Sequence, residues 1–154
     1  MSASRPLTVV PVPAHGGEDV LVVDGLVYTG TEDGSIFLLR PDGSRIDRVG
    51  QTGGRPLGLE LLPDGRLLVL ERRFSWARGL AIRIRSVPLA MIKPGALVDG
   101  TELITADMGQ QIDNMEALSV HRDSGGALVL TLISDDNFSM LQRTILLQFA
   151  LVAE

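Results

Sequence analysis

Short apolar runs, each broken by Gly, Pro or Asp, follow one another along the chain. Within each run the apolar positions alternate with polar ones, or are continuous over about four to eight residues, as in β-strands. The pattern predicts strands at residues 7–12, 20–23, 26–29, 35–40, 45–49, 57–61, 66–71, 80–87, 102–106, 117–121, 127–134 and 143–151. Only residues 89–92 fit a helical turn, and Pro94-Gly95 would end it. The predicted fold class is therefore all-β.

The strands fall into groups of four, with group starts near Glu18, Arg55 and Glu116. Spacings of roughly 40 and 60 residues fit four-stranded propeller blades, the second enlarged by a long loop. The third group has only three strands, and the strand at residues 7–12 supplies the fourth. We therefore predict three complete blades in a single domain that spans residues 1–154.

Three blades do not close a ring, because propellers have roughly four to eight blades around a channel. Two chains related by a two-fold axis would give six blades, with residues 7–12 completing the last blade of the partner chain. The sequence thus predicts half of a six-bladed β-propeller that is completed by homodimerisation. The alternative is a bent sandwich closed within one chain.

The composition narrows the classes of partner. The net charge is −5, and no cluster of Lys or Arg interrupts it, which argues against a nucleic-acid partner. No cysteine is present, so disulfides and thiolate catalysis are excluded. Hydrophobic residues make up 45% of the chain although only 4% are aromatic, which fits either an unusually large core or an apolar surface covered by a partner.

The first six residues, Met-Ser-Ala-Ser-Arg-Pro, lack the apolar region of a signal peptide. No apolar run approaches the ~20 residues that cross a bilayer. We therefore expect a soluble protein with no membrane partner. The compartment stays open, and a periplasmic or secreted location fits if a signal peptide has been removed.

Motifs in the first half resemble one known group of propellers. The motifs are Gly-Gly-Glu-Asp-Val at 16–20, Tyr-Thr-Gly-Thr-Glu-Asp-Gly at 28–34, Gly-Gly-Arg-Pro-Leu-Gly-Leu at 53–59 and Pro-Asp-Gly-Arg-Leu-Leu-Val at 63–69. In this order they resemble the strictosidine-synthase-like and gluconolactonase group, over residues 5–70. In the gluconolactonase-like group a glutamate that resembles Glu18 is a metal ligand.

Motifs in the second half resemble the esterase-like phytase propellers. They read Leu-Glu-Arg-Arg-Phe-Ser at 70–75, Arg-Gly-Leu at 78–80, Asp-Asn-Met-Glu-Ala-Leu at 113–118, Leu-Ile-Ser-Asp-Asp-Asn-Phe-Ser at 132–139 and Gln-Arg-Thr at 142–144. This likeness covers residues 66–152. Both groups are full-length propellers, longer than this chain. The two resemblances together imply a chimera, a recombined half-propeller with its seam near residues 66–71.

Strand polarity brings the loops that precede each group to one end of the blades. Glu18 and Glu116 start equivalent innermost strands there and should point into the mouth of the channel. With Asn114 they offer oxygen ligands that suit Ca²⁺ or another divalent cation. The alternative is a solvated acidic rim, or mutual repulsion relieved by Arg55.

Candidate catalytic and substrate-binding residues share this end. His15 and Asp135 are the candidate general bases. The candidate substrate-binding residues are Arg55, Arg72, Trp76, Asp136 and Asn137. Each has a structural alternative: a solvated histidine in a Gly-rich loop, a tight Asx turn at residues 135–137, or a tryptophan that caps the enlarged second blade.

No Gly-x-Ser-x-Gly elbow, Walker motif, dinucleotide fingerprint or zinc pattern occurs in the sequence. The sequence therefore predicts a metal-assisted hydrolase of esters or lactones on a six-bladed dimer. In this hypothesis a bound cation such as Ca²⁺ polarises the carbonyl and activates water. The alternative function is a catalytically idle propeller scaffold or binding module.

Overall fold

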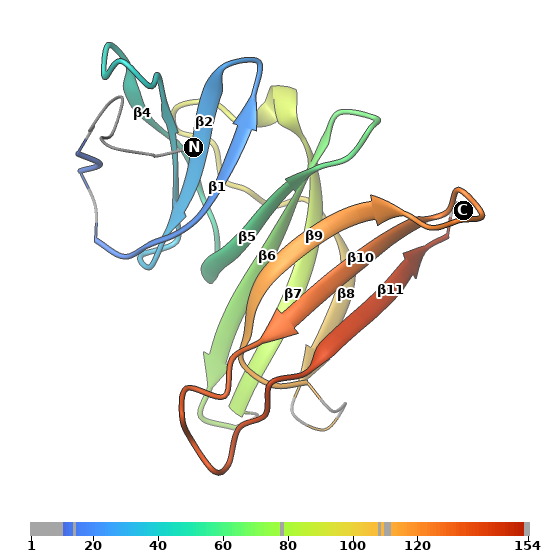
Figure 1. The fold of residues 1–154 in the computed structure, drawn as a ribbon. Coiled ribbons are helices and arrows are strands. Elements are labelled where there is room, and N and C mark those ends of the chain that lie inside the picture. Colours follow the sequence, from blue (N-terminus) through green and yellow to red (C-terminus); the bar gives the residue numbers. More distant parts are fainter. Residues whose placement is uncertain (1–10, 14, 78, 108, 110–111, 153–154) are drawn as a thin grey trace, which may run out of the picture.

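The chain forms an all-β structure in a computed structural model that describes residues 11–13, 15–77, 79–107, 109 and 112–152. Eleven strands and one short 3-10 turn make up the regular elements of the described residues. The strands form three antiparallel sheets, each a meander in which neighbours in sequence pair with one another. Figure 1 shows the three sheets as separate blades. This is a partial propeller-like fold, not the two layers of a sandwich.

Blade 1 contains β1 (Gly17–Val23), β2 (Leu26–Thr31), β3 (Ser35–Leu39) and β4 (Ile46–Gln51). Blade 2 contains β5 (Arg55–Leu61), β6 (Arg66–Ser75), β7 (Gly79–Pro88) and β8 (Thr101–Asp107), with the 3-10 turn at Leu89–Met91. Blade 3 contains β9 (Met115–Arg122), β10 (Leu128–Ser134) and β11 (Leu146–Leu151).

The strands predicted between residues 20 and 151 are confirmed, with boundaries that differ by a few residues. The helical turn at residues 89–92 is confirmed as the 3-10 turn. Residues 7–10 of the first predicted strand lie outside the described residues, and Pro11 and Val12 belong to no strand. Their place in the last blade therefore stays a prediction.

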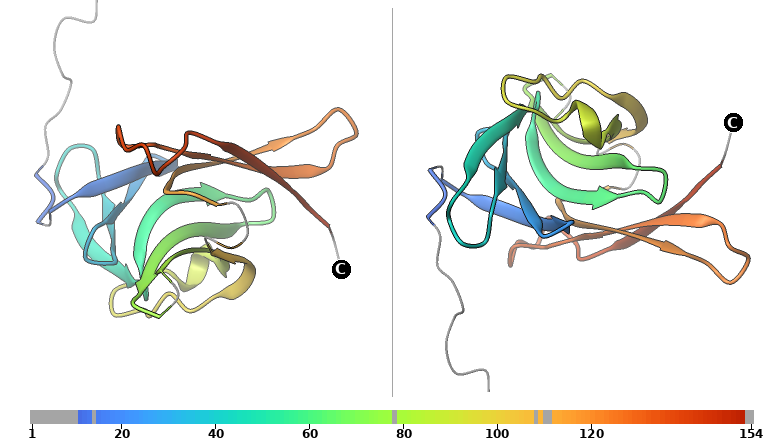
Figure 2. Two further views of the ribbon diagram at one scale, coloured as in Figure 1. Left: turned by 90° about the horizontal axis from the view of Figure 1, so that it is seen from below. Right: turned by 90° about the horizontal axis from the view of Figure 1, so that it is seen from above.

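Blade 2 lies between the other two blades (Figures 1 and 2) and supplies side chains to both hydrophobic cores. Leu68 and Leu70 of β6 pack toward blade 3, with Leu118, Leu130 and Leu132 among their neighbours. The alternate residues Leu67 and Val69 of the same strand pack toward blade 1, in a core that includes Tyr28, Ile36 and Leu38. Residues 67–70 of β6 are 0% exposed. A strand covered on both faces reads as a continuous apolar run, as this one does.

The innermost strands β1, β5 and β9 lie next to one another at the centre of the partial ring. The Leu59 N–H of β5 donates a hydrogen bond of 2.7 Å to Oδ2 of Asp19 on β1. The inner edge of each blade is a sheet edge with backbone groups that need partners. Side chains from the adjacent blade supply one of them here.

No helix within the described ranges is long and apolar enough to cross a membrane.

Candidate functional site

Two glutamates stand at the same position of two innermost strands, at the end of the blades where those strands begin. The pairing of β1 with β2 skips Glu18, and the pairing of β9 with β10 skips Glu116. Each is the extra residue of a β-bulge. Bulges bend a strand, re-aim a side chain and are common beside active sites. The two blades thus present a carboxylate from the same place, as the sequence indicated.

Glu18 lies against an arginine of the next blade. Its Oε1 accepts a hydrogen bond of 2.9 Å from Arg55 Nε and a second bond from Arg55 Nη2. Arg55 Nη2 also lies 2.9 Å from Oε1 of Glu32, in the loop between β2 and β3. The Glu18 side chain is 11% exposed and that of Arg55 is 30% exposed. Part of the positive charge is therefore open to solvent.

The glycine before this cluster is required by its geometry. Gly16 has a positive φ of 65°, a conformation that other residues rarely adopt. A Cβ at this position would lie 2.1 Å from Cγ of Glu32. The carbonyl of Gly16 also accepts a 3.0 Å hydrogen bond from the Glu32 N–H. Gly16 thus lets the start of β1 and the β2–β3 loop come together.

Glu116 belongs to a second cluster, formed with Asn114 and Arg72. Asn114 Nδ2 donates a hydrogen bond to Oε1 of Glu116, and Arg72 Nη1 donates a bond of 2.5 Å to Oδ1 of Asn114. Arg72 Nη1 lies 3.9 Å from Oε1 of Glu116. Asn114 is 4% exposed, whereas a third of the Glu116 side chain is open to solvent. The amide therefore holds both the acid and the guanidinium in place.

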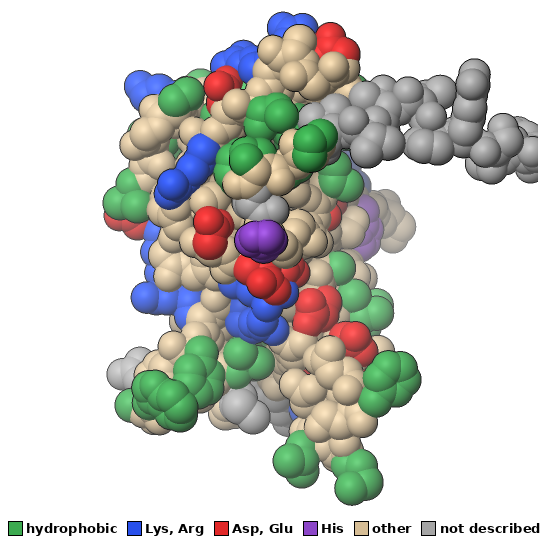
Figure 3. Space-filling model, turned by 90° about the vertical axis from the view of Figure 1, so that its left-hand side faces the viewer, with side chains coloured by type: hydrophobic (Ala, Val, Ile, Leu, Met, Phe, Trp, Pro, Cys, Tyr) green, Lys and Arg blue, Asp and Glu red, His purple; other side chains and the backbone are tan. Residues whose placement is uncertain are grey.

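The two clusters meet in blade 2, because Arg55 and Arg72 are direct partners across β5 and β6. A row of charged side chains thus runs from blade 1 through blade 2 to blade 3. Figure 3 shows charged side chains of both signs gathered on one face of the molecule, above two lobes that carry hydrophobic side chains. We call the set of Glu18, Arg55, Arg72, Asn114 and Glu116 the charged row.

The loop between β10 and β11 is attached to this row. The Asp135 N–H donates a 3.1 Å hydrogen bond to the carbonyl of Asn114. Asp113 Oδ2 accepts a 2.8 Å bond from the Arg143 N–H at the other end of the loop. The sequence expected Asp135 to approach Glu116, and the structure brings its backbone to the residue two positions before Glu116.

The side chains of residues 135–137 form turns. Oδ1 of Asp135 accepts the N–H of Asn137 at 3.1 Å, and Oδ1 of Asp136 accepts the N–H of Phe138 at 3.0 Å. Asn137 and Phe138 have positive φ values of 49° and 57°. These are the Asx turns named as the structural alternative. The role of Asp135 as base and of Asp136 and Asn137 in substrate binding stays a prediction.

Two other predicted site residues lie further out at the same end. His15 is exposed in a bend two residues before β1. Trp76 is 96% exposed at the tip of the β6–β7 hairpin, so it does not cap blade 2. Its ring packs edge-to-face against Phe74, with centroids 5.2 Å apart.

Sequence reasoning missed several features of this end. The hydrogen bond of Asn114 to Arg72 had no local signal, since Arg72 is 42 positions away. Glu32 was placed at this end by the strand order but not assigned to the site. Phe138, Met140 and Leu141 are more than 90% exposed. Their signal was available, because they are apolar residues within a polar loop.

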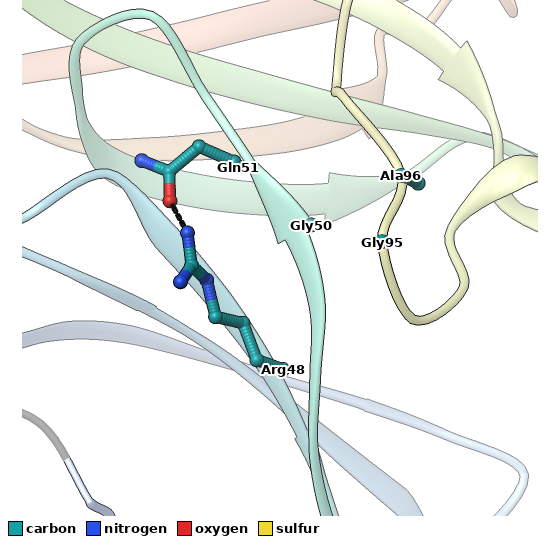
Figure 4. A pocket seen from close by; sticks show the side chains of 5 residues that line it. All are labelled: Arg48, Gly50, Gln51, Gly95 and Ala96. Atoms are coloured by element: carbon teal, nitrogen blue, oxygen red, sulfur yellow. Dashed lines mark hydrogen bonds between the residues drawn. The ribbon is translucent and has the colours of Figure 1, made fainter.

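A pocket on the outer side of blade 1 lies apart from the charged row. It is lined by Arg48, Gly50, Gln51, Gly95 and Ala96, between β4 and the long loop of blade 2 (Figure 4). Arg48 Nη2 donates a hydrogen bond to Oε1 of Gln51. Nε2 of Gln51 donates in turn to the Asp33 carbonyl at 2.9 Å. The lining polar groups are thus used to hold two loops together.

One oxygen of each predicted cation ligand is bonded to another group. Glu18 Oε1 accepts from Arg55, Asn114 Oδ1 accepts from Arg72, and Glu116 Oε1 accepts from the Asn114 amide. In the described part of the chain, no three His, Cys, Asp or Glu side chains are grouped as a metal would require. As arranged, the charged row does not fit a divalent cation, because guanidinium groups hold the positive charge. The Ca²⁺ expectation stays an untested prediction.

The comparisons with known proteins point to one family. The model of the phytase-like family, described by the esterase-like activity of phytase, matches residues 17–138. The chain matches none of the curated proteins. The family match runs through residues 66–71, where the sequence suggested a seam between two families, and the comparisons give no support to a strictosidine-synthase-like or gluconolactonase-like half. With most of its length matched from β1 to the β10–β11 loop, the chain belongs to the phytase-like family of esterase-like propellers.

Proposed function

We propose that the chain is a hydrolase of esters or lactones and that the charged row is its active site. The family match supports hydrolysis at a coarse level. The observation that carries the proposal is the Arg72–Asn114–Glu116 cluster, in which a guanidinium and a partly exposed carboxylate are held by one buried amide. A carboxylate and a fixed cation are the two charges that water attack on a carbonyl requires.

The chemistry follows from these two groups. The oxygen of a water molecule forms a bond to the carbonyl carbon, and Glu116 accepts a proton from this water. The carbonyl oxygen becomes an oxyanion, which the Arg72 guanidinium stabilises. When the tetrahedral intermediate collapses, the bond to the alcohol oxygen breaks, and Glu116 returns its proton to the departing alkoxide. A lactone reacts in the same way, but its acid and alcohol remain one molecule.

Arg55 of blade 2 and Glu18 of blade 1 form the matching pair. Arg55 is 30% exposed and is anchored by both Glu18 and Glu32. In the proposal it binds a polar or anionic group of the substrate next to the reacting carbonyl. His15 and Asp135 are the competing candidates for the base.

A second copy of the chain would complete the ring. Val20 and Val22 on β1 are 62% and 64% exposed, and Ile133 and Leu146 on the outer side of blade 3 are 43% and 60% exposed. These residues lie on the two flanks of the partial ring. A homodimer would bury both flanks and bring two charged rows around one axis.

The test is hydrolysis of short aryl esters and small lactones by the protein and its variants. We expect slow activity, with Glu116→Gln and Arg72→Gln each reducing kcat/KM by about 100-fold or more. Asp64→Asn, in a turn at the opposite end of blade 2, is the matched control and should keep the activity. Equal activity in all three variants would exclude the charged row as the active site.

Two further experiments distinguish this proposal from a metal-assisted reaction and from a reaction in which His15 is the base. A chelator should leave the activity unchanged, whereas its loss and recovery with Ca²⁺ would support a metal-assisted reaction. His15→Ala should leave the pH dependence of the hydrolysis rate unchanged. A profile that disappears in His15→Ala but not in Glu116→Gln would identify the histidine as the base.

A further inference from the structure

Five large apolar side chains are exposed on two loops at the end of the molecule that carries the charged row. Phe74 and Trp76 on the β6–β7 hairpin are 63% and 96% exposed, and Phe138, Met140 and Leu141 on the β10–β11 loop are 105%, 102% and 93% exposed. We call these two groups the apolar tips. Figure 3 shows two separate lobes with hydrophobic side chains below the charged side chains. Groups of exposed apolar side chains mark binding sites in soluble proteins.

Both tips are held by defined local structure. The hairpin remains paired from Arg66 and Pro88 at its base to Ser75 and Gly79 beside the tip. The edge-to-face contact with Phe74, at an interplanar angle of 83°, orients the ring of Trp76. The second tip follows the Asx turns of residues 135–138, and the Ser139 N–H donates 2.8 Å to the Asp136 carbonyl. These side chains are therefore displayed by the fold.

The bases of the two loops meet at one residue of the proposed active site. Arg72, two residues before Phe74, donates to the side chain of Asn114. Asp135, three residues before Phe138, donates to the backbone of the same Asn114. The bases of both tips therefore adjoin the Arg72–Asn114–Glu116 cluster. Sites for small organic ligands likewise combine apolar side chains with a few polar groups.

We propose that the apolar tips hold the apolar acyl or aryl arm of an ester whose carbonyl lies at Arg72 and Glu116. The substrate class is thus an ester with a sizeable hydrocarbon group. This inference rests on the proposed hydrolase function. Its physical basis is that transfer of the arm from water to the tips is favourable, by up to about fourfold in affinity per methylene.

The first test is a series of p-nitrophenyl esters from acetate to octanoate. We expect kcat/KM to rise with acyl length, and the rise to flatten when Trp76 or Phe138 is replaced by Ser. Met91→Ser is the matched control, because Met91 is 60% exposed on the 3-10 turn of blade 2, away from the tips. A length dependence that is the same in all three variants would overturn the proposal.

The second test does not depend on hydrolysis. Trp76 is the only tryptophan of the chain, so its fluorescence reports on one tip alone. Octan-2-one, a ketone that cannot be hydrolysed, should shift the emission to shorter wavelength, and butan-2-one at the same concentration should shift it less. Phe138→Ser and Met140→Ser should weaken the octan-2-one response, because the arm lies between both tips. Met91→Ser should not.

The two tests fail independently. A fluorescence response without hydrolysis of any ester would keep the apolar site and remove the hydrolase proposal. Hydrolysis without a fluorescence response or length dependence would remove the apolar site and keep the hydrolase proposal. Phosphatidylcholine vesicles serve as a further probe. A blue shift with vesicles but none with octan-2-one would mean that the tips bind a lipid surface, and the proposal would be overturned.

Discussion

Blade 2 and its two neighbours are built from similar strands but differ in how many faces they bury. Blade 2 packs against blade 1 through one face and against blade 3 through the other. Blade 3 buries one face and leaves Leu146 60% exposed on the other. In blade 1, Val22 of β1 remains 64% exposed, although every residue of β3 is buried. The sequences record this difference, since β6 contains the continuous run Leu-Leu-Val-Leu at 67–70 and β11 alternates exposed with half-buried residues.

The difference in burial also determines where removal of one partner of an ion pair lowers stability most. Glu71 follows the apolar run of β6 and is 0% exposed. Its Oε2 accepts hydrogen bonds of 3.0 and 2.5 Å from Arg83 Nε and Nη2 on the adjacent strand. A buried ion pair is tolerated when both partners remain, and removal of one leaves an uncompensated charge. Blade 1 carries an ion pair in a more exposed position, between Arg45 and Asp47, whose side chains are 44% and 35% exposed.

The largest expected effect is therefore the loss of Glu71. We expect Glu71→Ala to lower the free energy of unfolding by about 3–5 kcal/mol, because Arg83 would stay buried without its partner. Urea denaturation followed by circular dichroism measures the change. Glu32→Ala in blade 1, at an acid that is 51% exposed, is the matched change and should cost less than about 1 kcal/mol. Equal losses would show that burial of blade 2 does not set the cost.

A smaller effect is expected from truncation of the blade 2 core. Leu70→Ala removes a side chain that is 0% exposed and should cost about 2–5 kcal/mol, through lost burial and the cavity that remains. Val22→Ala removes an exposed side chain from blade 1 and should cost less than about 0.5 kcal/mol in the isolated chain. The same urea titration compares them. A large loss at Val22 would indicate that its face is covered in the folded protein.

How much of the structure the sequence predicts also depends on burial. The strands and blades were predictable because burial of one or two faces fixes the apolar period of each strand. The equivalent positions of Glu18 and Glu116 followed from the repeat of the blades, but the β-bulges at both residues were not predicted. Arg55 was named as a partner that relieves the charge of Glu18, although the two are 37 positions apart. The hydrogen bond of Asn114 to Arg72 was beyond the sequence, because it depends on how blades 2 and 3 dock. The predicted metal was inferred from carboxylate and amide oxygens and from the resemblance of Glu18 to a metal ligand, and the bond of Arg72 to Asn114 was not part of that inference.

The exposed flanks lead to a prediction about assembly. If two copies close a ring, light scattering after size exclusion should give a mass near twice 16.5 kDa. Val22→Lys or Leu146→Lys should lower the mass to that of a folded monomer, because burial of a charge in an apolar interface is unfavourable. Arg45→Glu, at an exposed turn of blade 1, is a surface control that should keep the dimer. A protein that runs as a monomer before any change would contradict the closed ring.

The smallest effect is expected at Glu60, on the innermost strand of blade 2. Burial raises the pKa of this carboxyl above its usual value of 4.5, and the nearby Asp19 raises it further, although the Val120 N–H of blade 3 lowers it. A raised pKa means that the folded state binds the proton more tightly than the unfolded chain. This contribution to stability is full below the unfolded pKa and is lost as the pH rises through the folded pKa. Glu60→Gln should therefore be stabilising relative to the parent at pH 7 and not at pH 4, by no more than about 1 kcal/mol because the group is only partly buried. Urea titrations at both pH values measure the difference.

Asp33 in blade 1 provides the contrast, since hydrogen bonds from Thr31 and Ser35 lower its pKa and its contribution to stability is lost as the pH falls. If Glu60→Gln shows the pH dependence expected for Asp33, the carboxylate of Glu60 is stabilised by its bond to blade 3 more than it is penalised by burial.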